Sequence, residues 1–401
     1  MAITNCDDYS TSIQVPQFVK PQKLAGGRPE MNGIRPVMYT GGFCVVFPYT
    51  TNNAKYAVRC WHAQVEGAQE RMKRISEFLS QQSLPYFVDF QYEEEGINTS
   101  KGVLPIIVMD WVDAQPLKKY IKNKIGNASA LNDLADNFMQ MVKDLHNIGI
   151  SHGDLQHGNI MVKNDGSLVL VDYDSLYVPS ISGYSSVTNG LCGYQHPVRF
   201  SMTNVSPKAD YFSELVIYTS IKALAKFPNL WEKLQMEDTD TMIFSKEDIE
   251  SKGYSEIFSE ISKDEYLAKL VNTLRDFLTK TSIEQLKPLE EVEPNFAENA
   301  EKENIKERIC SLLCGIDETT EVQTEKEWIE RVDLASISIS EINRHLETAL
   351  RLNKQYVEKK KREELVKGLS DQWKEHTYTP QKSTVNSAEM LKDLRADWEQ
   401  N

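Results

Sequence analysis

The stretch from Ser151 to Tyr177 most constrains what this chain can fold into. It contains two short apolar runs, residues 160–162 and 168–171. These runs predict two buried strands joined by a tight hairpin turn. Asp154 and Asn159 precede the first strand, and Asp172 follows the second. Because a hairpin brings its outer ends together, the three polar groups are predicted to form one compact functional site.

The chemistry of this cluster suits phosphoryl transfer. That reaction needs a group that orients the attacking hydroxyl, ligands for Mg²⁺, and a cation or amides on the phosphates. Asp154, in a loop between a helix and a strand, is predicted to accept the hydroxyl proton. Asn159 and Asp172 offer an amide oxygen and a carboxylate, which a hard cation prefers. The alternative reading is that Asp154 and Asn159 merely cap loops.

Composition narrows the class of protein. The 401 residues suffice for two or more domains, and the net charge of -14 argues against binding nucleic acid or an anionic membrane. No apolar run approaches the roughly 20 residues that span a bilayer, and the first residues show no secretory signal. The six cysteines are scattered, as expected of a reducing compartment. We therefore expect a cytoplasmic protein.

The pattern along the chain predicts an α+β protein in four parts. Residues 1–36 are polar, contain prolines and suggest an extended N-terminal arm. Residues 37–112 are strand-like with one helix, and residues 113–290 are mainly helical. Residues 291–401 suggest an acidic, proline-containing linker followed by helices.

The motifs resemble the protein-kinase superfamily from about residue 37 to about residue 285, in an atypical form of the bacterial serine/threonine kinases. His152-Gly153-Asp154 with Asn159 resembles the family's His-Arg-Asp…Asn loop, and Asp172-Tyr173-Asp174 stands at its Asp-Phe-Gly position. Residues 193–197 fall where its activation segment closes, and Asp210 resembles the aspartate that braces the catalytic loop. The resemblance implies a small lobe of antiparallel sheet with one helix, a larger helical lobe, and ATP with Mg²⁺ between them. The helical C-terminal region is then an extension of that fold.

The same resemblance assigns a nucleotide site. Arg59 aligns with the lysine that grips the α- and β-phosphates, and Asn159 and Asp172 with the metal ligands. Gly41 and Gly42 of a thin glycine loop would approach the phosphates, and Val46 and Ala57 would pack on adenine. Met109 would lie at the back of the adenine pocket, with Asp110 and Val112 at the hinge.

Three departures from the family pattern stand out. Arginine is longer and planar, so Arg59 is not equivalent to lysine. The position of the family's helix glutamate, which pairs with that lysine, is occupied by Ile75, with Glu70 and Glu77 as the nearest carboxylates. Gly153 replaces the arginine that binds a phosphorylated residue of the activation segment. We therefore expect activity not to depend on phosphorylation of that segment through this arginine.

One further departure concerns the substrate, and two histidines also need a role. Gln156 stands where many protein kinases have a lysine that touches the γ-phosphate. His157 and His196 are expected to be loop residues rather than metal ligands.

The sequence leaves three functions open. An ATP- and Mg²⁺-dependent serine/threonine protein kinase is favoured, because residues 175–197 have the length of an activation segment. A pseudokinase that acts as a nucleotide-binding scaffold is the first alternative, suggested by Arg59 and the thin glycine loop. A small-molecule phosphotransferase is the second, since the His-Gly-Asp-Leu…Gly-Asn loop is also similar to those of aminoglycoside and choline phosphotransferases. A narrow apolar stripe from Ile342 to Tyr356 suggests a face for the domain, a protein substrate or a regulatory partner.

Overall fold

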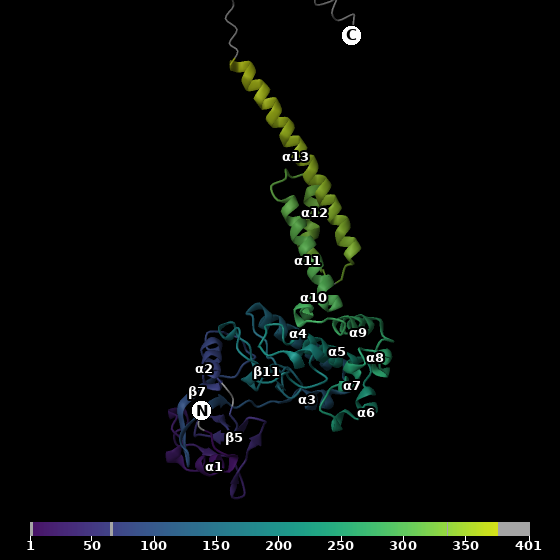
Figure 1. Ribbon diagram of the computed structural model, residues 1–401. Coiled ribbons are helices and arrows are strands. Elements are labelled where there is room, and N and C mark those ends of the chain that lie inside the picture. The colour runs from purple at the N-terminus through teal and green to yellow at the C-terminus, as the bar shows by residue number, and fades with distance from the viewer. Residues whose placement is uncertain (1–2, 65–66, 335, 376–401) are drawn as a thin grey trace, which may run out of the picture. The chain divides into compact units, whose positions relative to one another are not determined.

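The computed structural model describes residues 3–64, 67–334 and 336–375. The chain forms two compact units, residues 1–297 and 298–401 (Figure 1). The first unit combines an antiparallel sheet with many helices, so the expected mixed fold with antiparallel strands is present.

The sheet of the first unit contains six strands in the order β1-β5-β6-β8-β7, with β4 also paired to β5. Its pairs are antiparallel, and Arg59 lies opposite Val46 on one side and Ile107 on the other. The short strand pair β2–β3 lies outside this sheet. The strands are β1 (Arg28–Pro29), β2 (Met31–Asn32), β3 (Arg35–Pro36), β4 (Tyr39–Thr40), β5 (Cys44–Thr50), β6 (Lys55–Trp61), β7 (Phe90–Thr99) and β8 (Gly102–Asp110).

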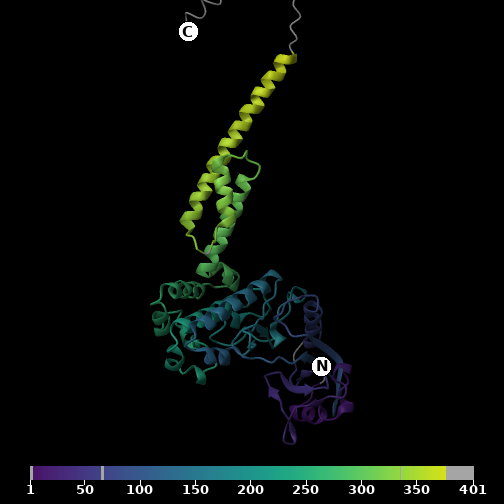
Figure 2. The ribbon, with the colours of Figure 1, turned by 180° about the vertical axis from the view of Figure 1, so that it is seen from behind.

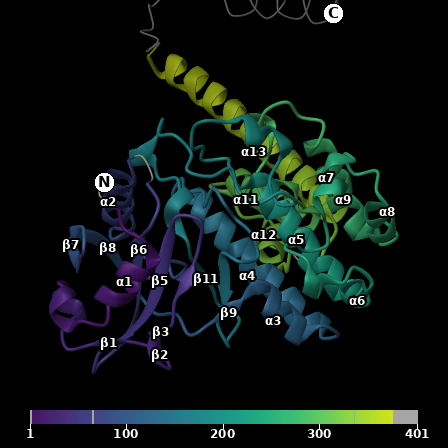
Figure 3. The same cartoon turned by 60° about the horizontal axis from the view of Figure 1, so that its bottom comes forward.

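Both faces of this sheet are covered, which explains why most residues of β5 and β6 are buried. Helix α2 (Ala68–Leu79) lies on one face and buries Met72 and Ile75 in the large core. Helix α1 (Cys6–Ser12) lies on the other face and is drawn over the strands in Figure 3. The sheet is therefore the middle of three layers.

The N-terminal residues do not form the extended arm that their prolines suggested. Asn5 caps α1, and Tyr9 and Ile13, four residues apart, enter a core cluster against the sheet. The Tyr9 hydroxyl also donates to the carbonyl oxygen of Trp61 at 3.0 Å. Burial of these apolar side chains outweighs the polar character of the rest of the segment, which becomes a layer of the fold.

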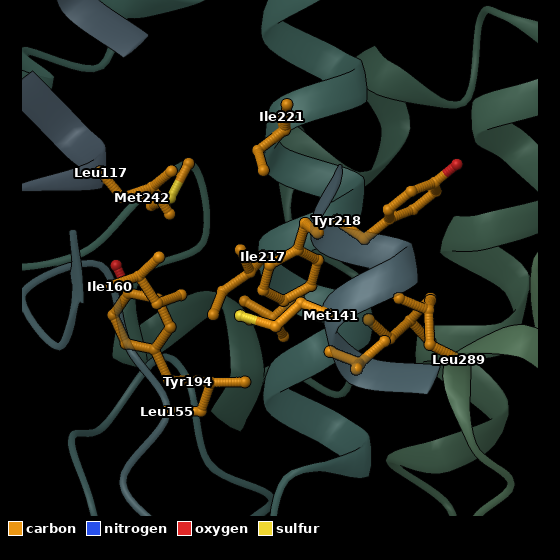
Figure 4. Packing of buried hydrophobic residues seen from close by; sticks show 14 of the residues in the cluster. Leu117, Met141, Leu155, Ile160, Tyr194, Ile217, Tyr218, Ile221, Met242 and Leu289 are labelled. Carbon is orange, nitrogen blue, oxygen red and sulfur yellow. The ribbon is translucent and has the colours of Figure 1, made fainter. Parts of the chain in front are cut away.

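Helices form most of the remainder of the first unit. Helices α4 and α5 lie before and after the Ser151–Tyr177 stretch, and α5 is the strongly apolar helix whose side chains fill the core in Figure 4. A three-stranded sheet in the order β11-β10-β9 carries the predicted hairpin. The elements are β9 (Gln115–Pro116), α3 (Leu117–Lys124), α4 (Ala128–Asn147), β10 (Ile160–Val162), β11 (Leu168–Leu170), α5 (Tyr211–Lys226), α6 (Leu230–Lys233), α7 (Lys246–Glu250), α8 (Glu256–Ile261), α9 (Glu265–Phe277) and α10 (Leu289–Val292).

A buried ionic group joins α4, α5 and α10. His146 bonds Glu214 through Nε2 at 2.9 Å and Glu290 through Nδ1 at 2.9 Å. Burial opposes the charge of the imidazole, but the two carboxylates raise the pKa of His146 to about 10. The histidine is therefore charged at neutral pH and bridges two acids that would otherwise repel each other.

We expect His146→Gln to destabilise the protein by about 3–5 kcal/mol at pH 7, the usual cost of removing one partner of a buried pair. A histidine pKa of about 10, raised from about 6.5 in the unfolded chain, gives stability that is full below pH 6.5. That stability is lost as the pH rises toward 10. Urea unfolding at pH 7 and pH 10 should therefore show a gap between wild type and variant that shrinks with pH, and an unchanged gap would contradict the assignment.

The second unit contains helices and its own core cluster. Helices α12 (Thr320–Arg331) and α13 (Ile339–Glu375) lie along one another, as Figures 1 and 2 both show, and α11 (Pro294–Leu313) contributes to the same cluster. Ile342 and Ala349 of the predicted apolar stripe are buried in that cluster. The last turns of α13 expose Leu365, Val366 and Leu369.

The acidic segment after residue 286, predicted to be a linker, is helical, and the boundary between the two compact units falls within it, after residue 297. Pro288 caps α10, and Pro294 is the first residue of α11. Proline is favoured at a helix start because it lacks only an amide hydrogen that has no partner there. Among the described helices, none is both long and apolar enough to cross a bilayer.

Candidate active site

The loop between α4 and β10 is fixed from below by Asp210, at the start of α5. The backbone amide of Gly153 donates to Asp210 Oδ1 at 3.0 Å, and the amide of His152 donates to Oδ2. His152 is buried, and its Nε2 donates to the Val171 carbonyl oxygen at 2.9 Å. Asp210 therefore has the bracing position that the resemblance implied. It fixes the backbone immediately before Asp154.

Asp154 presents a carboxylate that is partly withdrawn from water. Its Oδ1 is buried and has no hydrogen-bond partner among the described residues. Burial raises the pKa of Asp154 to about 6; the nearby Asp172 carboxylate adds to the rise, and His152 opposes it. A carboxylate that accepts a proton near neutral pH is suited to general base catalysis.

The hairpin brings Asn159 and Asp172 together as predicted. Ile160 pairs with Leu170, and the Val171 amide donates to the Asn159 carbonyl oxygen at 3.0 Å. The Asn159 side-chain amide donates Nδ2 to the Asp154 carbonyl oxygen at 2.7 Å, which ties it to the catalytic loop. Asp172 follows β11 with φ of 66°, a conformation that aspartate tolerates better than most residues.

These two residues fit a magnesium ion that is shared with phosphates. Asn159 uses its amino group in the bond to Asp154, so its amide oxygen is the end suited to a cation. The Asp172 side chain is 49% exposed and is accessible to a ligand. Mg²⁺ is commonly held by one or two carboxylates together with substrate phosphates, and this donor set matches that chemistry.

Arg59 on β6 is buried and paired with the loop after β11. Its Nη2 donates to Asp172 Oδ1 at 3.0 Å and to Asp174 Oδ2, and its Nε donates to Cys44 Sγ at 2.8 Å. Burial opposes its charge, but Asp174 and then Asp172 raise the pKa of Arg59 above the usual arginine value. The guanidinium therefore stays charged beside the predicted metal ligand.

None of the α2 side chains considered from the sequence pairs with Arg59. Ile75 is fully buried among apolar residues, Glu70 accepts from Arg74 at 2.6 Å, and Glu77 is exposed. Asp174 is the residue that sequence reasoning missed. Two features of the sequence could have indicated it. Asp174 is a second acid where the family has glycine, and the family's glutamate on the helix is missing.

The predicted adenine residues lie on adjoining strands. Ala57 and Met109 are partners across β6 and β8, and Val46 lies on β5 opposite Arg59. At the predicted hinge, Val112 is half-buried and Asp110 is exposed, with its side chain bonded to Lys23 at 3.0 Å. Asp110 can therefore offer its backbone to a ligand while its carboxylate is engaged elsewhere.

The glycine pair forms a tight turn between β4 and β5. The Gly41 amide donates to the Cys44 carbonyl oxygen at 2.8 Å, and His62 Nε2 donates to the Gly41 carbonyl oxygen at 3.0 Å. A Cβ built on Gly42 would meet no atom within 4 Å. The backbone amides of Gly41 and Gly42 were predicted to approach the phosphates. The Gly41 amide already donates a hydrogen bond within the turn.

Gly153 has a steric reason to be glycine. Its φ is +77°, and a Cβ there would collide with the backbone carbonyl oxygen of Ser175. Any side chain at this position, including the arginine of the family motif, would have to displace the backbone at Ser175. The structure therefore gives the physical reason for the departure from the His-Arg-Asp motif.

Replacing Gly153 by alanine should destabilise the protein by about 1–3 kcal/mol, the cost of a strained backbone position. Gly183→Ala is the matched control, because Gly183 has φ of +84° but open space around it. Chemical denaturation should show the larger loss for Gly153→Ala. Equal losses would mean that the Ser175 contact adds nothing to the backbone strain.

Residues 175–199, which follow the Asp172–Asp174 loop, are bonded to helix α2 and to the catalytic loop. Arg71 of α2 donates Nη2 to the Ser185 carbonyl oxygen, and Arg199 donates to the Gly153 carbonyl oxygen at 2.7 Å. His196 is buried and donates to the Phe277 carbonyl oxygen at 2.9 Å. His157 bonds the Tyr194 hydroxyl at 2.6 Å, and burial lowers the pKa of His157 to about 4. Both histidines have packing and hydrogen-bonding roles here.

Comparisons with known proteins agree with this geometry. The chain is 27% identical over 165 residues, 38% of its length, to the probable serine/threonine-protein kinase PknB of Bifidobacterium longum, covering 23% of that protein. It is also 34% identical over 102 residues, 24% of its length, to a putative uncharacterized protein of Dictyostelium discoideum, covering 10% of it. The chain thus spans less than a quarter of either relative. The family model for the protein kinase domain matches residues 37–288, more than half of the chain, and the chain therefore belongs to the protein kinase family.

Proposed function

We propose that this protein transfers the γ-phosphoryl group of ATP to serine or threonine hydroxyls of a protein substrate. The observation that carries the proposal is the cluster at the hairpin end, where Asp154, Asn159 and Asp172 converge on a loop fixed by Asp210. Family membership supports kinase chemistry in general. The two-lobed arrangement with a nucleotide between the lobes is part of the same proposal.

Each residue of the cluster has one role in this reaction. Asp154 accepts the proton of the attacking hydroxyl, and its raised pKa of about 6 suits that task. Asn159 and Asp172 would hold Mg²⁺, which neutralises charge on the phosphates when bound. Arg59 lies beside Asp172 and would orient the phosphates, with Val46, Ala57 and Met109 against the base.

A protein substrate is supported by the segment between Ser175 and Pro197. This segment is bonded to α2 through the Ser185 carbonyl oxygen, which accepts from Arg71, and to the loop before β10 through the Tyr194 hydroxyl, which bonds His157. The Gln156 side chain accepts from the Gly158 amide at 3.2 Å, within its own loop.

Compartment and partners belong to the same proposal. All six cysteines are free thiols, which supports a reducing, cytoplasmic compartment. A protein partner at the C-terminal helices is supported by the exposed apolar side chains near the end of α13.

A nucleotide-binding pseudokinase is the second candidate. It is favoured by one observation, the bonds from Arg59 to both Asp172 and Asp174, which occupy the cation that would grip phosphates. In that case the site would bind nucleotide without transferring the phosphoryl group.

Incubation with radiolabelled ATP, Mg²⁺ and a protein mixture would separate the two candidates. The proposed kinase should label protein, and phosphoamino-acid analysis should find phosphoserine or phosphothreonine. Thermal shift with ATP measures binding separately, because a ligand stabilises by RT ln(1 + [L]/Kd). Binding with no labelling would support the pseudokinase, and neither binding nor labelling would contradict both.

A further inference from the structure

We propose that Asp174 is the positioning residue for Arg59, in place of a carboxylate on helix α2. The inference rests on the proposed nucleotide site, since Arg59 is positioned there to meet phosphates. It assigns a role to the acid that stands where the family motif has glycine. It also means that one loop supplies both the metal ligand and the anchor of the phosphate-binding cation.

The contacts of Arg59 fix its guanidinium on two sides. Nε donates to Cys44 Sγ at 2.8 Å, at the end of the glycine turn. Nη2 donates to the carboxylates of Asp172 and Asp174. Nη1 takes part in none of these three bonds and is the group that could extend to a phosphate.

The backbone around Asp174 is rigidly held, as a positioning residue requires. Asp174 lies in a 3₁₀ turn, Tyr173–Ser175. The Tyr173 hydroxyl donates to the Leu170 carbonyl oxygen at 2.8 Å and accepts from the Val88 amide at 3.0 Å. The Tyr173 ring also packs on Phe87 and Phe90 of the strand region, with centroids 5.6 and 5.3 Å away.

The two aspartates that meet Arg59 differ in exposure. The Asp172 side chain is 49% exposed, while the Asp174 side chain is 13% exposed and the Arg59 side chain 5%. The accessible carboxylate of Asp172 can turn to a bound cation, whereas the buried carboxylate of Asp174 faces Arg59. Asp174 is therefore the anchor that would persist when a nucleotide and metal are bound.

Helix α2 is committed elsewhere. Its buried polar residue is a cation, Arg71, which donates to the Ser185 carbonyl oxygen. Ile75 fills the core at the position of the family glutamate, and Glu70 bonds Arg74. The helix thus contributes positive charge and apolar packing near the site, and the acid comes from the loop.

The test is Asp174→Asn, which keeps size and hydrogen-bonding capacity but removes the charge. We expect the KM for ATP and the Kd for Mg²⁺-ATP to rise about 10- to 100-fold, as is usual when a residue that orients a ligand-binding group is changed. Asp174→Glu, which keeps the charge, should recover part of this loss. In the Arg59→Ala background, Asp174→Asn should add little to the loss of affinity, because the two residues act as one unit.

Glu70→Gln and Glu77→Gln are the matched controls, since they neutralise the α2 carboxylates. Both should leave the KM for ATP unchanged, and melting temperatures of all variants identify any that fail to fold. Wild-type KM and Kd in a folded Asp174→Asn variant would overturn the inference, as would a large effect of Glu70→Gln or Glu77→Gln. If Asp174→Asn does not fold, a wild-type Kd in Asp174→Gly would overturn it equally.

The outcomes also separate this inference from the proposed function. If the wild type binds Mg²⁺-ATP but labels no protein, weaker binding by Asp174→Asn would support the positioning role although the transfer proposal had failed. If the wild type labels protein and Asp174→Asn is equally active with an unchanged KM, the transfer proposal stands and the positioning role is wrong.

Discussion

Asp154→Asn should lower the rate of phosphoryl transfer by about 10²- to 10⁴-fold, the usual contribution of a general base. Asparagine has nearly the shape of aspartate but cannot accept the hydroxyl proton. The loop around it should stay in place, because its amides are held by Asp210 and its Asp154 carbonyl oxygen by Asn159. Initial rates with radiolabelled ATP measure the loss directly.

Binding of nucleotide should be retained in this variant, since the role proposed for Asp154 is toward the acceptor hydroxyl and not the phosphates. Thermal shift with Mg²⁺-ATP should therefore match that of wild type. Asp165→Asn is the matched control, because Asp165 lies in the turn at the other end of the same hairpin and, among the described residues, its side chain accepts hydrogen bonds from Ser167 alone. Full transfer activity in folded Asp154→Asn would exclude Asp154 as the base.

Arg59→Ala is expected to cost stability as well as nucleotide binding. The change leaves the Asp174 carboxylate buried without its cation, and breaking a buried pair in this way costs about 3–5 kcal/mol. It also removes the positive charge that is proposed to bind the phosphates. Urea unfolding gives the stability loss, and titration with Mg²⁺-ATP gives the loss of affinity. Arg35→Ala, at an exposed arginine on β3, should change neither.

Arg59→Lys should fall between these results. A lysine keeps the charge but is a single ammonium group, so it cannot reproduce the forked contacts to Cys44, Asp172 and Asp174. We expect most of the stability to return and the affinity for Mg²⁺-ATP to return only in part. Wild-type affinity in Arg59→Lys would show that the forked geometry of arginine is not needed here.

The local parts of the site could be predicted from sequence because they lie within one hairpin. Asp154, Asn159 and Asp172 are separated by at most 18 residues, and the strand pattern alone places their chain ends together. The brace from Asp210 followed from the family resemblance, and the structure supplies its two backbone contacts.

The pairing of Arg59 with Asp174 could not be predicted in the same way. The two residues are 115 positions apart, and their contact depends on how β6 packs against the loop after β11. Sequence reasoning searched α2 for the partner because the family places it there. The missing glutamate and the additional acid were each visible, but nothing local connects them.

At both ends of the kinase match, the prolines gave no indication of the helices that form there. Composition predicted an arm and a linker; the first segment covers a sheet face instead, and the second begins two helices, of which α11 spans the boundary between the two units. In each case a few apolar side chains or a helix-start position decided the structure. Mean composition over tens of residues does not resolve such positions.

The layer formed by residues 3–36 has a consequence for where the folded unit that contains the kinase match begins. Family similarity starts at residue 37, but Tyr9, Ile13 and Leu24 shield Phe47 and Val58 on the outer face of the sheet. A fragment that begins at residue 37 would expose this apolar sheet face to solvent, and we expect such fragments to aggregate through it. The part of the chain that matches the family is therefore shorter than the part needed to bury this face.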